Sequence, residues 1–230
     1  MSPTPRERAR IDTMQRILES GRTQLAEHGA AALSLRAVAR DLGMVSSAVY
    51  RYVASRDELL TALIIEGYQD LAVVVEAATA GRAAPGRRFI ALCEAIYQWA
   101  LDHPHQYALL YGSPVPGYRA PADTIVDAAR VPVAAIQLVD AAWTAGSLVS
   151  DVPMPTASPA LRRQAKDVAA ALGTQLPERV LVRFAAAWTQ VFGAISFDLF
   201  GQFVGSFEPG DQICTYTFRS AAQTIGFPES

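Results

Sequence analysis

The sequence predicts an all-α protein with a small N-terminal domain and a larger C-terminal one. From about residue 86 onward every long segment carries apolar residues at helical spacing, and no strand alternation is sustained over several segments. Nearer the N-terminus, two short helical segments flank a glycine and precede a longer helix. We expect a three-helix domain over residues 1–54 and a larger helical domain over residues 55–230.

The first short helix of this N-terminal motif is expected to follow Ser34, whose hydroxyl is suited to capping it. Its apolar residues share one helix face: Leu35, Val38, Ala39 and Leu42. Gly43 comes next and supplies the backbone freedom that a tight turn between helices needs.

The second short helix is expected to be capped by Ser46 and to turn Val49 and Val53 inward. Ser55 and Glu58 have the spacing of a capping box, which opens a third, longer helix. Two helices around a glycine-containing turn form a helix-turn-helix, which lays its second helix in the major groove of DNA. The motif therefore indicates a DNA-binding protein.

This motif resembles the DNA-binding domain of the TetR family of bacterial transcriptional regulators. The similar parts are the start at Ser34–Ala39, the Leu42–Gly43 turn, the recognition helix at Ser47–Tyr52 and the exit at Ser55–Leu59. Many relatives end the recognition helix with Tyr-x-His-Phe, whereas Val53 takes the place of the phenylalanine here. We expect a smaller core beneath the helix and the same docking on DNA.

The side chains of the recognition helix and its flanks suit DNA contact. Short side chains at the helix start allow a close approach to phosphates and base edges, and Arg51 can reach a guanine edge or a phosphate. Arg36 can equally be a plain surface residue. The expected DNA-binding residues are Ser34, Arg36, Ser46, Ser47, Ala48, Tyr50, Arg51, Tyr52 and Arg56.

The charge distribution agrees with this interpretation although the net charge of −2 does not. Residues 1–58 hold nine arginines and seven acidic residues, a balance of +2, while the remainder holds eleven basic and fifteen acidic residues, a balance of −4. The positive excess lies with the helix-turn-helix, as phosphate contact requires. Because it is modest, we expect binding to depend on a dimer and on specific contacts.

The rest of the chain predicts a succession of helices. A disordered tip over residues 1–5 precedes a helix that ends at His28, with Gly29 as its C-cap. The helix from Ser55 should stop near Gly81. Further helices are expected at about 86–102, from Pro104 to Gly112, at 121–148 with a bend at Pro132, and, after a proline-rich loop over 150–159, at 159–172, 177–203 and 210–225.

The 177–203 helix is apolar over most of its circumference, so it must be buried on more than one side. The segment Trp188–Gly193 also resembles the C-terminal domain of some TetR relatives with a Trp…His-Gly signature, with Phe192 in place of the histidine. The resemblance implies a homodimer formed by the last two long helices and a palindromic operator; alternatively, both helices are simply core. The expected interface residues are Phe192, Ser196, Leu199, Phe200, Phe203, Phe218 and Ala222.

A small-molecule effector is the second expected partner. Aromatic and polarisable residues fall on the helices that enclose the ligand cavity in TetR-like proteins, and such a lining suits an apolar or aromatic compound. Each of these residues can instead belong to the core. The expected ligand-binding residues are Phe89, Cys93, Tyr97, Tyr107, Tyr111, Trp143 and Trp188.

Other classes of protein find little support in the sequence. No apolar run approaches the ~18 residues of a membrane span, and the arginine-rich start is unlike a secretory signal. His103 and His105 lack the neighbours of a zinc site, and no catalytic or cofactor motif occurs. Cys93 and Cys214 suggest reduced, buried thiols of a cytoplasmic protein.

Together these features predict a non-enzymatic transcriptional regulator, a homodimeric repressor that a ligand releases from its operator. The predicted mechanism is a ligand-driven shift of the helix that begins at Ser55, which changes the separation of the two recognition helices. The alternatives are an activator or a ligand-independent regulator, and a helical small-molecule carrier that does not bind DNA.

Overall fold

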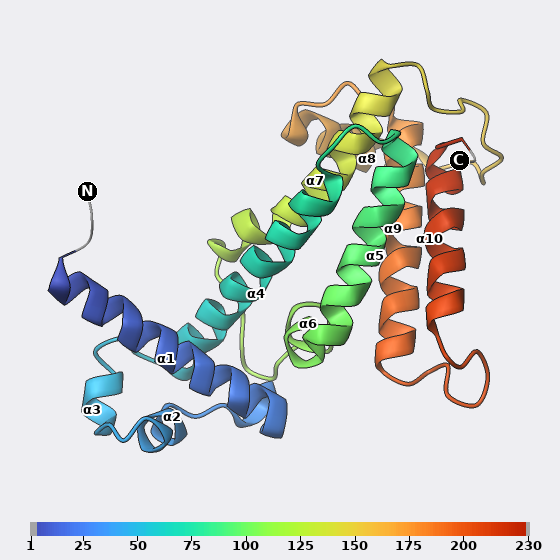
Figure 1. Cartoon of the computed structure of the whole chain (residues 1–230). Coiled ribbons are helices and arrows are strands. Elements are labelled where there is room, and N and C mark those ends of the chain that lie inside the picture. Colours follow the sequence, from blue (N-terminus) through green and yellow to red (C-terminus); the bar gives the residue numbers. More distant parts are fainter. Residues whose placement is uncertain (1–3, 229–230) are drawn as a thin grey trace. The chain divides into compact units, whose positions relative to one another are not determined.

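The structure, a computed structural model, describes residues 4–228, and its regular elements over that range are all helical (Figure 1). The predicted all-α fold is confirmed. The packing divides the chain into two compact units: the first is Met1–Asp70 with His103–Ala128, and the second is Leu71–Asp102 with Ala129–Ser230. The division falls within α4 and α7. The functional boundary expected after residue 54 stays a prediction.

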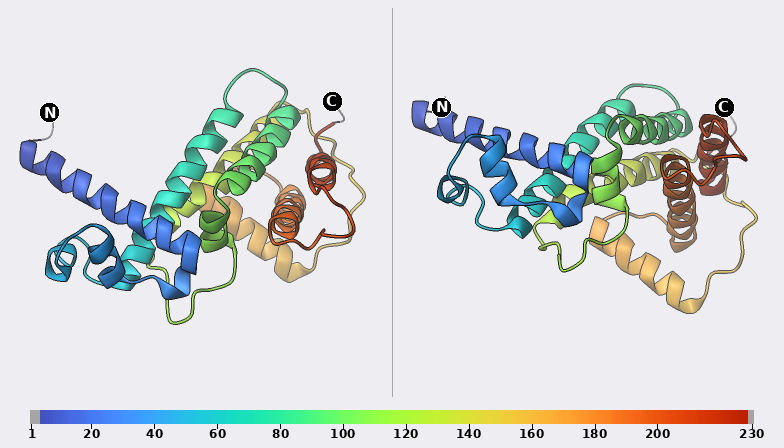
Figure 2. Two further views of the ribbon diagram at one scale, coloured as in Figure 1. Left: turned by 60° about the horizontal axis from the view of Figure 1, so that its bottom comes forward. Right: turned by 90° about the horizontal axis from the view of Figure 1, so that it is seen from below.

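The first unit contains the N-terminal helices and a later segment of the chain. Its elements are α1 (Pro5–His28), the short 3₁₀ helix η1 (Ala30–Ala32), α2 (Leu35–Asp41), α3 (Ser46–Val49), the first part of α4 (Arg56–Thr79), α6 (Pro104–Tyr111) and the start of α7 (Thr124–Thr144). The helices α2 and α3 lie together on one side of α1 (Figure 2). This arrangement is the predicted helix-turn-helix.

One hydrophobic core holds the first unit together. Leu109, Val115 and Tyr118, from the later segment, pack against it, so residues distant in sequence help to close it. Its buried members come from α1, α2, α3 and α4 and their connections: Ile17, Leu33, Leu35, Val38, Ala39, Val49, Val53, Leu59, Leu60 and Leu63.

The two ends of α1 follow from local sequence signals. Thr4 and Glu7 form a capping box, in which the Glu7 carboxylate accepts from the Thr4 N–H at 2.7 Å and the Thr4 hydroxyl accepts from the Glu7 N–H at 3.3 Å. The expected disordered tip is therefore wrong for Thr4 and Pro5, while residues 1–3 lie outside the described part. Gly29 is the C-cap, as predicted, with its N–H on the Leu25 carbonyl.

The turn between α2 and α3 depends on Gly43, which has φ +65°. The N–H groups of Gly43 and Met44 return to the carbonyls of Arg40 and Ala39, at 3.1 and 2.8 Å, and close the end of α2. No atom lies within 4 Å of a Cβ built on Gly43, so the positive φ alone requires glycine.

The starts of α3 and α4 differ in detail from their predictions. Val45 has the extended backbone of the N-cap of α3 and Ser46 is already helical, so the predicted Ser46 cap is wrong. At α4, the Ser55 hydroxyl accepts from the Glu58 N–H at 3.1 Å as expected. The Glu58 carboxylate accepts from the N–H of Ala54 rather than that of Ser55, at 2.5 Å.

The second unit contains the rest of α4 and α7, with α5 (Pro85–Asp102), α8 (Pro159–Leu172), α9 (Glu178–Leu199) and α10 (Asp211–Ile225). The helix α9 packs against α8 and α10, and α5 packs against both α9 and α10 (Figure 1). By length and composition α9 could cross a membrane. Val180, Phe184 and Val191 on this helix are buried in the second unit.

The chain segment after α10 packs against α5 at Gly86. A Cβ at Gly86 would lie 3.0 Å from the Phe227 Cβ, so the absence of a side chain at residue 86 lets Phe227 pack this closely. The Phe227 ring also lies 5.6 Å from the ring of Phe89, measured between centroids.

The two cysteines, Cys93 and Cys214, are free and buried, as the sequence predicts. Burial raises the pKa of both thiols, to about 12 for Cys214, so both are protonated at neutral pH.

Replacing Gly43 by alanine should lower the free energy of unfolding by about 1 kcal/mol, because a Cβ strains the left-handed backbone. The Gly43→Asn variant should lose less, since asparagine tolerates this conformation better. Denaturant titration followed by circular dichroism measures both. Equal losses in the two variants would contradict the assignment of strain to φ.

Candidate nucleic-acid interface

Two side chains of α1 hold α2 at both of its ends. At the C-terminal end, the carboxylate of Asp41 accepts from the Ser20 hydroxyl at 3.0 Å and from the Gln24 amide at 3.3 Å. At the N-terminal end, the Gln24 carbonyl oxygen accepts from the Ser34 N–H at 3.1 Å. Ser20 and Gln24 are both buried, so these bonds also satisfy polar groups that water does not reach.

This network revises the expected capping role of Ser34, while its predicted contact with DNA stays a prediction. The residue occupies the N-cap position of α2, but its hydroxyl makes no capping hydrogen bond; its N–H is bound by Gln24 instead. The sequence signal for this arrangement was two polar residues, Ser20 and Gln24, one turn apart on the inward face of α1.

Two arginines of the first unit are engaged within the fold. The Arg56 guanidinium donates to the carbonyls of Ala30 and Ala31 at 2.9 and 3.2 Å, which ties the start of α4 to η1. Arg22 pairs with both carboxylate oxygens of Glu66 at 2.7 Å. Arg56 therefore has a structural role, and its predicted contact with DNA stays a prediction.

The turn after α3 presents its side chains outward while valines anchor it from below. Val49 and Val53 are fully buried, whereas Tyr50 is 45% exposed and Arg51 is exposed. Tyr52 is half-buried, and the Arg10 guanidinium lies 5.7 Å from the centre of its ring. The contact between Arg10 and Tyr52 links α1 to the end of the predicted recognition helix, Ser47–Tyr52, which is called the recognition segment below. This contact was not predicted from the sequence.

Most arginines of the N-terminal region are available for phosphates. Seven are exposed, and none of them forms an ion pair with any residue between 4 and 228: Arg6, Arg8, Arg10, Arg16, Arg36, Arg40 and Arg51. Ser46 and Ser47 are also exposed, and Ala48 is half-buried. The first unit thus combines a basic surface with an exposed turn of short and aromatic side chains, as a DNA reader requires.

The residues predicted to bind a ligand are divided between the two units. Tyr107 and Tyr111 belong to the first unit, where their rings lie 5.2 Å apart and Tyr111 also meets Tyr68 at 6.1 Å. The others belong to the second unit, in which Phe89 and Cys93 are fully buried among packed helices. The ligand-binding role of all seven stays a prediction.

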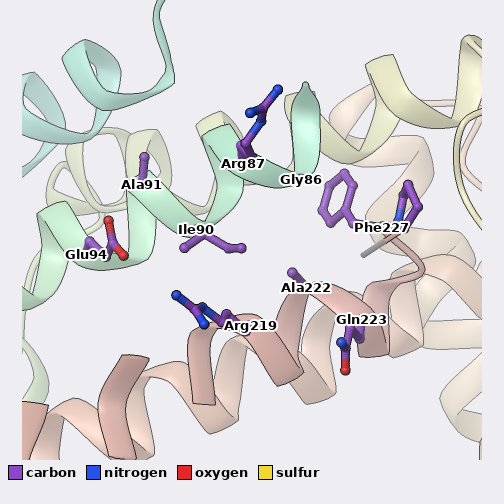
Figure 3. Close-up of a pocket in the computed structure, with 10 residues that line it drawn as sticks. Gly86, Arg87, Ile90, Ala91, Glu94, Arg219, Ala222, Gln223 and Phe227 are labelled. Atoms are coloured by element: carbon purple, nitrogen blue, oxygen red, sulfur yellow. The ribbon is translucent and has the colours of Figure 1, made fainter. Parts of the chain in front are cut away.

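The second unit contains a groove of about 530 Å³ between α5 and α10. In Figure 3, Ile90 and Arg219 point into the space between the two helices, whereas Arg87 points away from α10. A second, more open groove of about 370 Å³ lies between α9 and α10. None of the predicted ligand-binding residues lines either groove.

The residues predicted for the dimer interface also separate into two groups. Phe218 is fully buried, and Ala222 is 4% exposed at the groove between α5 and α10, so their predicted place in a dimer interface stays a prediction. Phe200 is 45% exposed, and Phe203 lines the groove between α9 and α10. Phe197 and Tyr216, which were not predicted, line this groove too and are 53% and 70% exposed.

Comparison with protein families matches two parts of the chain. Residues 17–63 match the model described as bacterial regulatory proteins, tetR family. Residues 89–220 match the model described as tetracyclin repressor-like, C-terminal domain.

Curated and solved proteins are similar over most of the chain. The HTH-type transcriptional regulator Rv1816 of Mycobacterium tuberculosis is 45% identical over 201 residues, which cover 85% of this chain and 84% of that protein. The crystal structure of SCO4313, described as a regulatory protein, has 33% identity and a TM-score of 0.76 over 95% of this chain and 98% of that one. The regulator PfmR of Thermus thermophilus, at 17% identity and a TM-score of 0.57, covers 94% of this chain and its own full length, and shares the fold.

Replacing Asp41 by alanine should lower the free energy of unfolding by about 1–3 kcal/mol, because Ser20 and Gln24 would be left buried without their acceptor. The matched control is Asp12→Ala, which removes an exposed carboxylate of α1 and should change little. Thermal unfolding of the two variants measures the difference. Similar melting temperatures would show that the network contributes no stability.

Proposed function

This chain belongs to the TetR family of bacterial regulatory proteins, and we propose that it acts as a homodimeric repressor that a small apolar or aromatic ligand releases from a palindromic operator. Its relatives support the broader role of a DNA-binding transcriptional regulator. The repressor activity, the dimer and the ligand are our inference. We place the protein in the cytoplasm and assign it no catalytic role.

The exposed turn after α3 is the observation that carries the proposal. Val49 and Val53 fix this turn on the core from beneath, while Ser47, Tyr50 and Arg51 are exposed. Buried anchors with polar, basic and aromatic side chains above them suit a surface that reads base edges and phosphates.

The groove between α9 and α10 supports a dimer. The aromatic side chains of Phe197 and Tyr216 are largely exposed there, next to the small residues Gly193 and Ala194. Small residues let a partner helix approach closely, and exposed aromatic residues are enriched where proteins associate. Two copies joined along this face would carry two recognition segments, as a palindromic site requires.

The proposed release mechanism uses α4, which runs from the DNA-binding unit into the second unit along the chain. A ligand that favours one position of this helix would change the spacing of the two recognition segments in the dimer. A change of spacing prevents both segments from docking in successive major grooves at once.

The proposal is tested by selecting genomic fragments that bind the purified protein, at low and at near-physiological salt. A palindromic sequence that is still bound at the higher salt is the expected result, because specific contacts add to the salt-sensitive phosphate term. Binding that is blind to sequence at both salts would refute the proposed operator.

Replacing Arg51 by alanine should weaken binding to the selected operator by about 1–3 kcal/mol, the contribution of a specific arginine contact with a base. The control is Arg163→Ala, which removes an exposed arginine of α8 and should leave the affinity unchanged. Fluorescence anisotropy with labelled operator gives both affinities. If the control loses as much affinity as Arg51→Ala, the recognition segment is misassigned.

Replacing Gly193 by leucine should weaken the dimer without unfolding the chain. No atom lies within 4 Å of a Cβ at Gly193, so the fold accommodates a side chain there, but a partner helix would meet it. The control is Ala170→Leu on the exposed face of α8. Sedimentation equilibrium should show a shift toward monomer for Gly193→Leu only, and an unchanged dimer would place the interface elsewhere.

A further inference from the structure

Arg183, in the second unit, is a buried arginine whose donors are only partly satisfied. It lies on α9 and is 4% exposed. Its Nη1 donates to the carbonyls of Val149 and Ser150 at 3.3 and 3.4 Å, close to the limit for a hydrogen bond. Its Nε and Nη2 are buried and have no hydrogen-bond partner in the described chain.

The two unsatisfied donors lie on the same edge of the guanidinium. The Nε–H and Nη2–H groups of arginine are parallel and match the spacing of two oxygens of one carboxylate or phosphate. Burying an arginine without a carboxylate partner costs free energy, because its charge is removed from water and no opposite charge compensates for it. This edge of Arg183 therefore lacks the kind of group that it is shaped to bind.

The charges around Arg183 favour an anion. Arg179 lies one turn earlier on α9, with its guanidinium 5.6 Å from the centre of the Trp143 ring. Asp151 is exposed and directly follows Val149 and Ser150, whose carbonyls accept from Arg183. Burial lowers the pKa of Arg183 and the charge of Arg179 lowers it further, while the charge of Asp151 acts in the opposite direction. Two positive groups and one negative group leave a positive charge in this region.

The guanidinium lies beside the backbone of Gly226. A Cβ at Gly226 would lie 2.8 Å from the Val149 carbonyl oxygen and 3.5 Å from Nη2 of Arg183. The Val149 N–H donates to the Gly226 carbonyl at 2.7 Å, so the segment that covers Arg183 is attached to the turn after α10 through backbone atoms.

We propose that Arg183 is the anchor of a binding site for a small oxyanion, a carboxylate or a phosphate, held by the Nε–H and Nη2–H donors together. Both donors are buried, so the packing around them must open for the anion to enter. A water molecule would satisfy the hydrogen bonds but would leave the charge uncompensated. The site stands independently of the proposed binding to DNA.

The experiment titrates the purified full chain with sodium acetate and, separately, with inorganic phosphate, replacing chloride so that ionic strength stays constant. Thermal unfolding and calorimetry should show saturable binding of one anion per chain for at least one of the two probes. The probe that binds distinguishes a carboxylate site from a phosphate site. No saturable binding of either probe would overturn the proposal.

Two variants assign the binding to this residue. Arg183→Met removes the charge while keeping a long side chain, and it should weaken the binding by about a hundredfold, since two charge-assisted hydrogen bonds are lost. Arg163→Gln removes an exposed arginine of α8 and should bind as the unchanged protein does. If Arg183→Met binds as tightly as the unchanged protein, the anion lies elsewhere and the proposal fails.

A measurement on the unchanged protein keeps the test decisive even where Arg183→Met unfolds. The ¹H–¹⁵N resonance of the Arg183 Nε–H should shift with the same saturation as the calorimetric binding, because this group donates to the anion. A resonance that does not move while the anion binds would overturn the proposal. Loss of operator binding would leave both readouts unaffected, so failure of the proposed repressor role is distinguished from failure of this site.

Discussion

The DNA-binding unit depends on the burial of Val49 and Val53, because the helix α3 is too short to be stable by itself. The helix α3 spans only Ser46–Val49, and a helix of one turn does not persist alone in water. Its geometry is imposed by the core it shares with α1, α2 and α4, to which both valines belong. Because the buried valines stabilise α3, the exposed side chains do not have to contribute to folding and are free to serve contact with DNA.

Local sequence signals predicted those features that local physics determines. Gly29 and Gly43 end their helices in the expected way, since a positive φ is the property of one residue. The prediction that Ser46 is an N-cap was wrong, although serine is a good N-cap residue. The helix begins at Ser46 itself, so the N-cap position with its extended backbone belongs to Val45. The spacing of Ser20 and Gln24 shows two inward polar residues, but their partner Asp41 lies 21 and 17 positions further on, so the local pattern did not identify it.

Hydrophobic periodicity also has a limit that α10 illustrates. An apolar face shows that a helix is covered, but not whether the cover is its own chain or another copy. Phe218 and Tyr216 lie two positions apart, yet one is fully buried and the other is 70% exposed. Counting arginines likewise does not show which of them are available to DNA. Arg56 is bound to backbone carbonyls while Arg51 is exposed, yet both contribute equally to the net charge. Arg183 is the extreme case, since nothing in the sequence distinguished it from a surface arginine.

The contact of Phe227 with Gly86 bears on how sequences of this kind can diverge. The two positions are separated by most of the larger unit, but a Cβ on one would press against the Cβ of the other at 3.0 Å. A mutation that gives residue 86 a side chain therefore requires residue 227 to move away by a few tenths of an ångström. Along a lineage, the space available at either position therefore depends on the residue and the backbone at the other, although the two lie far apart in the sequence.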